Sequence, residues 1–345
     1  MKRSKVGVEA ATCRSTALRR GLPFGAVMAT AGASGMAGRC GLPDLVVPLL
    51  ALAVLQAVWI PVIGVLRHRA EIRLGWAAWL EIGPVTEHAG IHTVPLGVAV
   101  ITGGWAGLSA WPLLPPLLAC LAMTWVLTIA SVGRFVWSLA ARGLQLKAMD
   151  GTWFLVPATL LGAAIATEDV AKLMPGHVTA TLDVLALASA ALGWLGYCAV
   201  IIVASARLWR FGLKGAPLAP WWIAMGCAGL AAAALGRVSH IAADDVHEQV
   251  LLAETMVATS FFSVALCVPV LLGSALFLLR YCRFHDAAVW TPTFSTAVFA
   301  LGCLQVGSDL PSAAFRSIGF AAGLATLVFW ALTAGWNLRK CMSSR

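Results

Sequence analysis

Residues 152–167 read TWFLVPATLLGAAIAT, an apolar stretch interrupted by one proline and one glycine. It contains no charged residue and no histidine, and its length approaches the about 20 residues that a membrane-spanning helix needs. A longer apolar stretch, residues 180–206, follows after a short break that contains Glu168, Asp169 and Lys172. We interpret the two stretches as a hairpin of one short and one long membrane-spanning helix.

The same alternation continues in both directions along the chain. Breaks that contain charges, Pro or Gly separate one apolar stretch from the next. The ten stretches are residues 23–40, 44–66, 93–110, 113–139, 152–167, 180–206, 220–237, 251–279, 290–306 and 312–338. The sequence therefore predicts an all-α polytopic membrane protein with ten transmembrane helices, arranged as five short–long hairpins.

The composition supports this fold class. Of the 345 residues, 60% are hydrophobic and 11% are charged, whereas a soluble domain has about 25% charged residues. This excludes a cytosolic enzyme, a disordered protein and a free nucleic-acid binder. The nine cysteines are scattered without a C-x-x-C pair, which favours small core residues over a disulfide framework or zinc site. No catalytic triad, phosphate-binding loop or dinucleotide motif is present, so we predict neither enzyme activity nor a cofactor.

The distribution of basic residues predicts the orientation. We expect a basic N-terminal tail (residues 1–20), a transmembrane domain (residues 21–339) and a short C-terminal tail (residues 340–345). With ten helices both tails lie on one side, which receives twenty of the 24 Lys and Arg residues. The other side keeps only Arg39, Lys172, Arg237 and Arg316. This asymmetry predicts a plasma (inner) membrane protein with both termini in the cytoplasm.

The five short stretches are rich in Gly, Pro and other small residues, which kink helices and leave backbone groups that lipid cannot satisfy. We therefore expect the short helices to line a central path and the long ones to face lipid. The interiors of the short stretches contain no Asp, Glu, Lys or His, which argues against proton coupling. Their hydroxyls could solvate a passing anion weakly. These hydroxyl residues are Thr30, Ser34, Thr102, Thr159, Thr293, Ser295 and Thr296.

Aromatic residues lie near prolines in several short stretches. A large ring in a path of small residues can close it by occlusion and dewetting, although a packed core ring gives the same pattern. The aromatic candidates are Phe24, Phe154 and Phe294, and Pro95, Pro157 and Gly226 complete the candidate lining.

Other polar groups carry weaker signals. Glu87, His88 and His92 offer too few ligands for a zinc site, so no metal is predicted. Residues 240–248 are interpreted as a solvated acidic loop, and Arg237 as a partner for its acids.

Five segments in order carry a resemblance to a known family. They are PFGAVMATAGAS from Pro23, HTVPLGVAVIT from His92, WFLVPATLLGAAIAT from Trp153, APWWIAMGCAG from Ala219 and AAVWTPTFSTAVFAL from Ala287. Together they resemble the tellurite-resistance/dicarboxylate transporter family, which includes bacterial tellurite-resistance proteins, fungal malate and sulfite transporters, and plant slow anion channels. The resemblance extends over nearly the whole span from Leu22 to Trp336.

The resemblance implies ten helices around a pseudo-five-fold axis, a central pore in each protomer and a homotrimer. It also implies a phenylalanine gate in the ninth helix, where a W-x-x-x-F motif falls on Trp290 to Phe294. Many relatives have Phe-Pro where this chain has Phe294-Ser295. Many also have Gly-Pro-x-Gly where this chain has Gly226 to Gly229, which changes the expected helix kinks.

The leading hypothesis is a passive anion channel or uniporter, embedded in membrane lipid, that conducts small inorganic or organic anions. Two alternatives remain open. One is a secondary exporter of sulfite, a C4-dicarboxylate or tellurite, and the other is a non-transporting membrane subunit or membrane-embedded enzyme.

Overall fold

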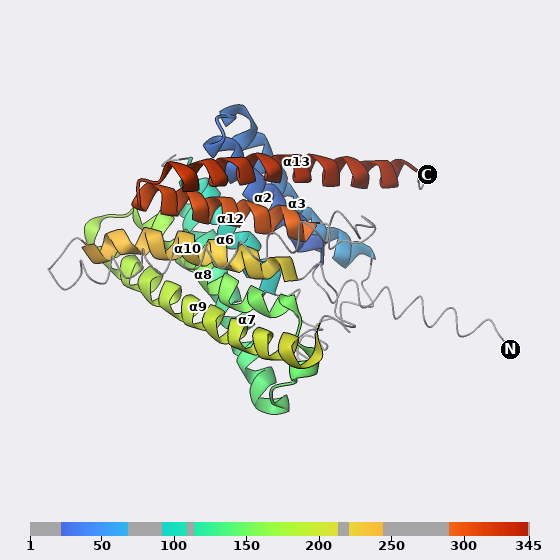
Figure 1. Cartoon of the computed structure of the whole chain (residues 1–345). Helices are drawn as coiled ribbons and strands as arrows, with labels where there is room; N and C mark the ends of the chain where they lie inside the picture. Colours follow the sequence, from blue (N-terminus) through green and yellow to red (C-terminus); the bar gives the residue numbers. More distant parts are fainter. Residues whose placement is uncertain (1–21, 68–91, 109–113, 213–220, 244–289, 344–345) are drawn as a thin grey trace.

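The computed structural model describes residues 22–67, 92–108, 114–212, 221–243 and 290–343, and all regular secondary structure in these residues is helical (Figure 1). The α-helices of this described part are α2 (Leu22–Arg39), α3 (Val46–Arg67), α6 (Thr93–Ala106), α7 (Leu114–Arg142), α8 (Leu155–Ala171), α9 (Gly176–Phe211), α10 (Trp222–Ala243), α12 (Trp290–Asp309) and α13 (Ala313–Ser343). The short 3-10 helices are η1 (Pro43–Leu45), η4 (Leu146–Ala148) and η5 (Gly151–Phe154).

These α-helices coincide with nine of the ten predicted stretches, and the remaining stretch, residues 251–279, lies outside the described residues. The predicted contrast in length is only partly present. Helix α9 has 36 residues and α6 has 14, but α3 and α10 both have 22. Length alone therefore does not separate the two kinds of helix.

Burial separates them more clearly. In α8 and α10, 89% of the most apolar window is buried inside the protein, against 17% in α3 and 22% in α13. The helices α2, α6 and α12 also consist largely of buried residues. We call α2, α6, α8, α10 and α12 the inner helices, and α3, α7, α9 and α13 the outer helices.

The inner helices form a closed ring. Each one contacts the next in the order α2, α6, α8, α10 and α12, and α12 returns to contact α2. Figure 1 shows part of this order, with α12 between α13 and α10. Because the ring closes on itself, every inner helix has one face toward a common axis and one face toward the outside.

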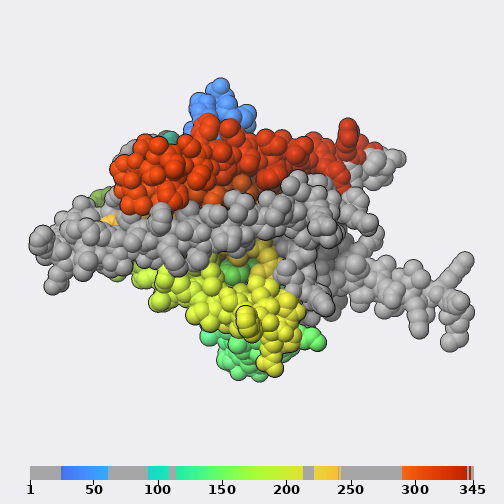
Figure 2. Space-filling model, in the orientation of Figure 1, coloured from blue at the N-terminus to red at the C-terminus, as the bar shows by residue number. Residues whose placement is uncertain are grey.

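Each outer helix covers a junction of this ring. Helix α3 contacts α2 and α6, α7 contacts α6 and α8, α9 contacts α8 and α10, and α13 contacts α12 and α2. Figure 2 shows α13 and α9 at the surface of the molecule. The remaining junction is that of α10 with α12, and residues 244–289, which connect these helices, lie outside the described residues.

The surface of the outer helices is apolar. Leu55 of α3, Val126 of α7 and Ile202 of α9 are each 65–68% exposed, which suits contact with lipid chains. Six of the described helices, including α8 and α10, are long and apolar enough to cross a membrane. Gly, Ser and Thr lower the hydropathy of α2 and α12, which explains their absence from this group. The chain is thus a helical, multi-pass membrane protein.

Glycines allow the inner helices to approach closely. A Cβ atom at Gly32 of α2 would lie 3.0 Å from Ala297 Cβ of α12, and one at Gly162 of α8 would lie 2.6 Å from Leu96 Cδ1 of α6. Small residues take this role in membranes because close backbone approach supplies the van der Waals contact that lipid does not drive.

Candidate functional site

The inner helices run parallel, with their C-terminal ends at one end of the ring. A Cβ atom at Gly103 of α6 would lie 2.9 Å from Asp169 Oδ2 near the end of α8, and Asp169 pairs with Arg237 near the end of α10. A Cβ atom at Gly236 of α10 would in turn lie 2.6 Å from Gln305 Cγ near the end of α12. Arg39, the last residue of α2, interacts electrostatically with both Arg237 and Asp169.

Phe294, the predicted gate, lies on the face of α12 that points toward the axis of the ring. Its neighbour Ser295 packs on Gly226 of α10, and Ala297 packs on Gly32 of α2. Residues advance by about 100° around a helix, so Phe294 falls between these two directions. The face of α12 turned away from Phe294 carries Gly307, where a Cβ atom would lie 2.8 Å from Arg316 N of α13.

The inward face of α12 continues beyond Phe294 through Val298, Leu301 and Gln305, at helical spacing. Phe294 and Val298 are each 5% exposed, whereas Leu301 and Gln305 are partly exposed. Side-chain exposure along this face therefore increases from Phe294 and Val298 toward the C-terminal end of α12.

The two residues beside Phe294 carry buried hydroxyls. Thr293 Oγ1 and Ser295 Oγ have no hydrogen-bond partner among the described residues, and both side chains are fully buried. An unpaired buried hydroxyl costs free energy unless water or a ligand reaches it. These two groups are therefore the hydroxyls near Phe294 that remain available to donate.

The other candidate hydroxyls are engaged. Thr102, Thr159 and Thr296 donate to backbone carbonyls of their own helices, as buried threonines in membrane helices often do. Thr30 Oγ1 accepts a hydrogen bond of 3.0 Å from Trp330 Nε1 of α13, and Ser34 Oγ donates to the Val46 carbonyl of α3. Thr30 and Ser34 thus bond outer helices.

The remaining predicted lining residues lie at other contacts. The ring of Phe154 packs on Tyr197 of α9 with a centroid distance of 5.9 Å, and Pro157 is next to Gly196 of the same outer helix. Gly226 belongs to the contact with Ser295, and Pro95 is buried in α6. The side chain of Phe24 lies outside the described residues. The structure therefore does not bring the candidate residues together along one surface.

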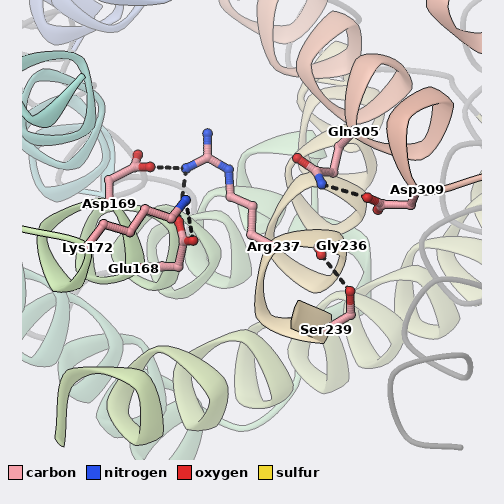
Figure 3. Close-up of polar contacts among 8 residues, drawn as sticks. All are labelled: Glu168, Asp169, Lys172, Gly236, Arg237, Ser239, Gln305 and Asp309. Carbon is pink, nitrogen blue, oxygen red and sulfur yellow. Dashed lines mark hydrogen bonds and ion pairs between the residues drawn. The ribbon is translucent and has the colours of Figure 1, made fainter. Parts of the chain in front are cut away.

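A charged cluster that the sequence analysis missed occupies the C-terminal ends of α8 and α10 (Figure 3). The predicted fifth stretch ends at Thr167, but α8 continues to Ala171 and places Glu168 and Asp169 inside the helix. Arg237 Nη1 donates to Glu168 Oε2 at 3.4 Å and to Asp169 Oδ1 at a shorter distance. Lys172 pairs with Glu168 Oε1 at 2.5 Å.

This cluster changes two expectations. The last turn of α8 contains two carboxylates, Glu168 and Asp169. Lys172 and Arg237 neutralise them, which allows α8 to continue past Thr167. Arg237 does pair with acids, but these belong to α8. The acids of residues 244–248, its predicted partners, lie outside the described residues.

No group of three or more metal-ligating side chains occurs in the part of the chain that the structure describes. His92 is 4% exposed, and its Nδ1 forms a hydrogen bond with Ser131 Oγ of α7. Glu87 and His88 lie outside the described residues.

The model of a family described as voltage-dependent anion channels matches residues 23–337, a range that overlaps all five inner helices. No curated protein matches the chain significantly.

Proposed function

The chain belongs to the voltage-dependent anion channel family, whose members are anion channels and transporters rather than enzymes, and from this premise we propose a passive anion channel or uniporter of the plasma membrane. The anion path follows the axis of the ring, and Phe294 closes it. The resemblance to the tellurite-resistance/dicarboxylate transporter family supports the same assignment.

The closed ring of parallel inner helices is the observation that carries this proposal. A ring of five helices leaves an axis that side chains must either fill or line. The inward face of α12 offers Phe294, Val298, Leu301 and Gln305, and none of these is ionisable. A stretch of path without fixed charge binds an anion weakly enough to release it, which conduction requires.

The same architecture supports the proposed topology of ten helices. The sequence predicts a helix in residues 251–279, which lie outside the described residues, and none of the described outer helices covers the junction of α10 and α12. Both termini are then cytoplasmic, and so are the N-terminal ends of the inner helices. Those ends carry the positive poles of five helix dipoles, which favours anions at the cytoplasmic entrance.

A homotrimer with one path per protomer is the proposed assembly. The apolar surfaces of the outer helices can face either lipid or a neighbouring copy. Because the ring closes within one chain, each protomer would hold a complete path and assembly would not create one.

The second candidate is a proton-coupled exporter of sulfite, a C4-dicarboxylate or tellurite. The observation that favours it is the presence of Glu168 and Asp169 in α8, because buried carboxylates can carry protons in transporters. Their ion pairs with Lys172 and Arg237 oppose it, because a carboxylate that took up a proton would have to give up its ion pair.

Flux from proteoliposomes separates the two candidates. Purified protein would be tested with chloride, nitrate, sulfite and malate, with and without a pH gradient, while the membrane potential is clamped with potassium and valinomycin. Anion efflux that follows the potential and ignores the pH gradient supports the channel. Efflux that requires the pH gradient and carries no current supports the exporter.

A further inference from the structure

We propose that Arg237 binds the transported anion at the mouth formed by the C-terminal ends of the inner helices, and that the Asp169 carboxylate competes with this anion for Arg237. This inference rests on the proposed function and adds a binding site for small monovalent anions at one end of the path. The site has a positive group that the anion contacts and a negative group that it displaces.

The guanidinium of Arg237 is only partly used. Nη1 makes both of its hydrogen bonds, one to Glu168 and one to Asp169. Its Nη2 and Nε groups have no partner among the described residues, and Figure 3 shows Nη2 pointing away from both carboxylates. The Nη2 and Nε hydrogens form the planar fork that binds an oxyanion with two parallel hydrogen bonds. A planar anion such as nitrate fits this edge.

The position of Arg237 relative to the ring supports access from the axis. Arg39 of α2 interacts electrostatically with Arg237 of α10 and Asp169 of α8, although α2 is a neighbour of neither helix in the ring. Charges on helices that are not adjacent can interact in this way when they extend toward the common axis. The side chains of Arg237 and Asp169 also keep 13% and 19% exposure, so water reaches both.

Electrostatics explains why a cation is needed at this end. The C-terminal ends of five parallel helices each carry about half a negative charge. Glu168, Asp169 and Asp309 add three carboxylates, which Arg39, Lys172 and Arg237 offset, so that without Arg237 an anion leaving the path here would meet a repulsive field. Arg237 is the cation that α10 contributes among these ends, and it lies between the acids of α8 and the Gln305–Asp309 pair of α12 (Figure 3).

Glu168 and Asp169 differ in the number of their ion-pair partners. Glu168 has Lys172 as a second partner, whereas the described residues bond the Asp169 carboxylate only through Arg237. Removal of the Asp169 charge would therefore release Arg237 from Asp169, while Glu168 would keep its ion pair with Lys172. Asp169 is the group that sets how strongly Arg237 attracts an external anion.

Anion binding can be measured without transport. Thermal unfolding of the purified protein in detergent would be followed against nitrate concentration, with gluconate keeping the ionic strength constant. We expect Asp169→Asn to lower the nitrate concentration for half-maximal stabilisation about fivefold, which corresponds to ~1 kcal/mol. The matched control Arg316→Gln removes an exposed charge at the start of α13, outside the ring, and should leave this concentration unchanged.

A second variant tests the planar fork. Arg237→Lys keeps the charge that the acids need, so folding is protected, but a lysine ammonium cannot form two parallel hydrogen bonds. Arg237→Lys should lower the affinity for nitrate relative to that for chloride. Wild-type protein and Arg316→Gln should have the same ratio of nitrate to chloride affinity. Equal nitrate affinity in wild type, Asp169→Asn and Arg237→Lys overturns the proposal.

Flux in the Phe294→Ala background separates this inference from the proposed function. If that variant conducts anions but Asp169→Asn and Arg237→Lys change neither binding nor nitrate preference, the mouth site is wrong and the channel stands. If nitrate binding shifts as expected while Phe294→Ala conducts nothing, the mouth site stands and the channel function fails.

Discussion

Gly229 of α10 and Gly302 of α12 lie back to back, so that the two inner helices touch through their backbones. A Cβ atom at Gly229 would lie 2.5 Å from Phe299 Cα, and one at Gly302 would meet the carbonyl oxygen of Gly229. The contact leaves no room for a methyl group on either side. It fixes the spacing of α10 and α12, and with it the position of Phe294.

Gly302→Ala should therefore destabilise the protein. The added methyl group has only backbone to push against, and overpacking of this kind costs about 1–3 kcal/mol. Thermal unfolding in detergent would measure the change. Gly133→Ala in α7 is the matched control, because nothing lies within 4 Å of its Cβ position. An unchanged unfolding temperature in Gly302→Ala would mean that α10 and α12 are not in backbone contact.

The bond between Thr30 of α2 and Trp330 of α13 ties an inner helix to an outer one. Thr30→Val keeps the shape of the side chain and removes the acceptor, which should cost about 0.6–1.7 kcal/mol as for other hydrogen bonds between membrane helices. A double-mutant cycle with Trp330→Phe measures the coupling. Additive effects of the two substitutions would show that the indole does not bond the hydroxyl.

The charged cluster predicts two unequal effects on stability. Arg237→Gln leaves Glu168 and Asp169 largely buried without their shared cation, and breaking such a pair costs about 3–5 kcal/mol. Lys172→Gln removes a side chain that is 63% exposed, and such an ion pair is worth about 1 kcal/mol or less. Unfolding of both variants in the same detergent gives the comparison. Equal losses would contradict the burial of the cluster.

Restoring neutrality provides the control for that comparison. The double variant Arg237→Gln with Asp169→Asn removes one charge of each sign and leaves Glu168 with Lys172. It should recover part of the stability that Arg237→Gln loses. A double variant less stable than Arg237→Gln would show that Asp169 is stabilised by something other than Arg237.

Sequence patterns located the helices well because hydrophobic stretches and their breaks report directly on burial in a membrane. The ninth predicted stretch, residues 290–306, agrees with α12 (Trp290–Asp309) at its first residue. The alternation of inner and outer helices was also predicted, since Gly-rich and Pro-rich stretches suit contacts on all sides. The family itself was identified from five short segments, and the family match confirms it.

Sequence patterns did not predict where single side chains point. Thr30 and Ser34 were expected along the path, but each bonds an outer helix, because the rotation of α2 about its axis depends on glycine contacts such as that of Gly32 with Ala297. The predicted fifth stretch ends at Thr167, before the true end of α8, because a charged residue such as Glu168 ordinarily interrupts an apolar span. Glu168 is paired with Lys172, one turn later in α8, and with Arg237, which is 69 residues away in sequence.

Chloride efflux from proteoliposomes that contain Phe294→Ala or Phe299→Ala tests whether Phe294 closes an anion path along the axis of the ring. Both rings are buried in α12, but Phe294 faces the axis of the ring, whereas the backbone of Phe299 packs on Gly229 of α10. We expect Phe294→Ala to speed efflux about tenfold or more, as a barrier lowered by ~1.4 kcal/mol would, and Phe299→Ala to leave the rate unchanged. Wild-type rates in Phe294→Ala, or equal increases in both variants, would contradict a path along the axis closed by Phe294.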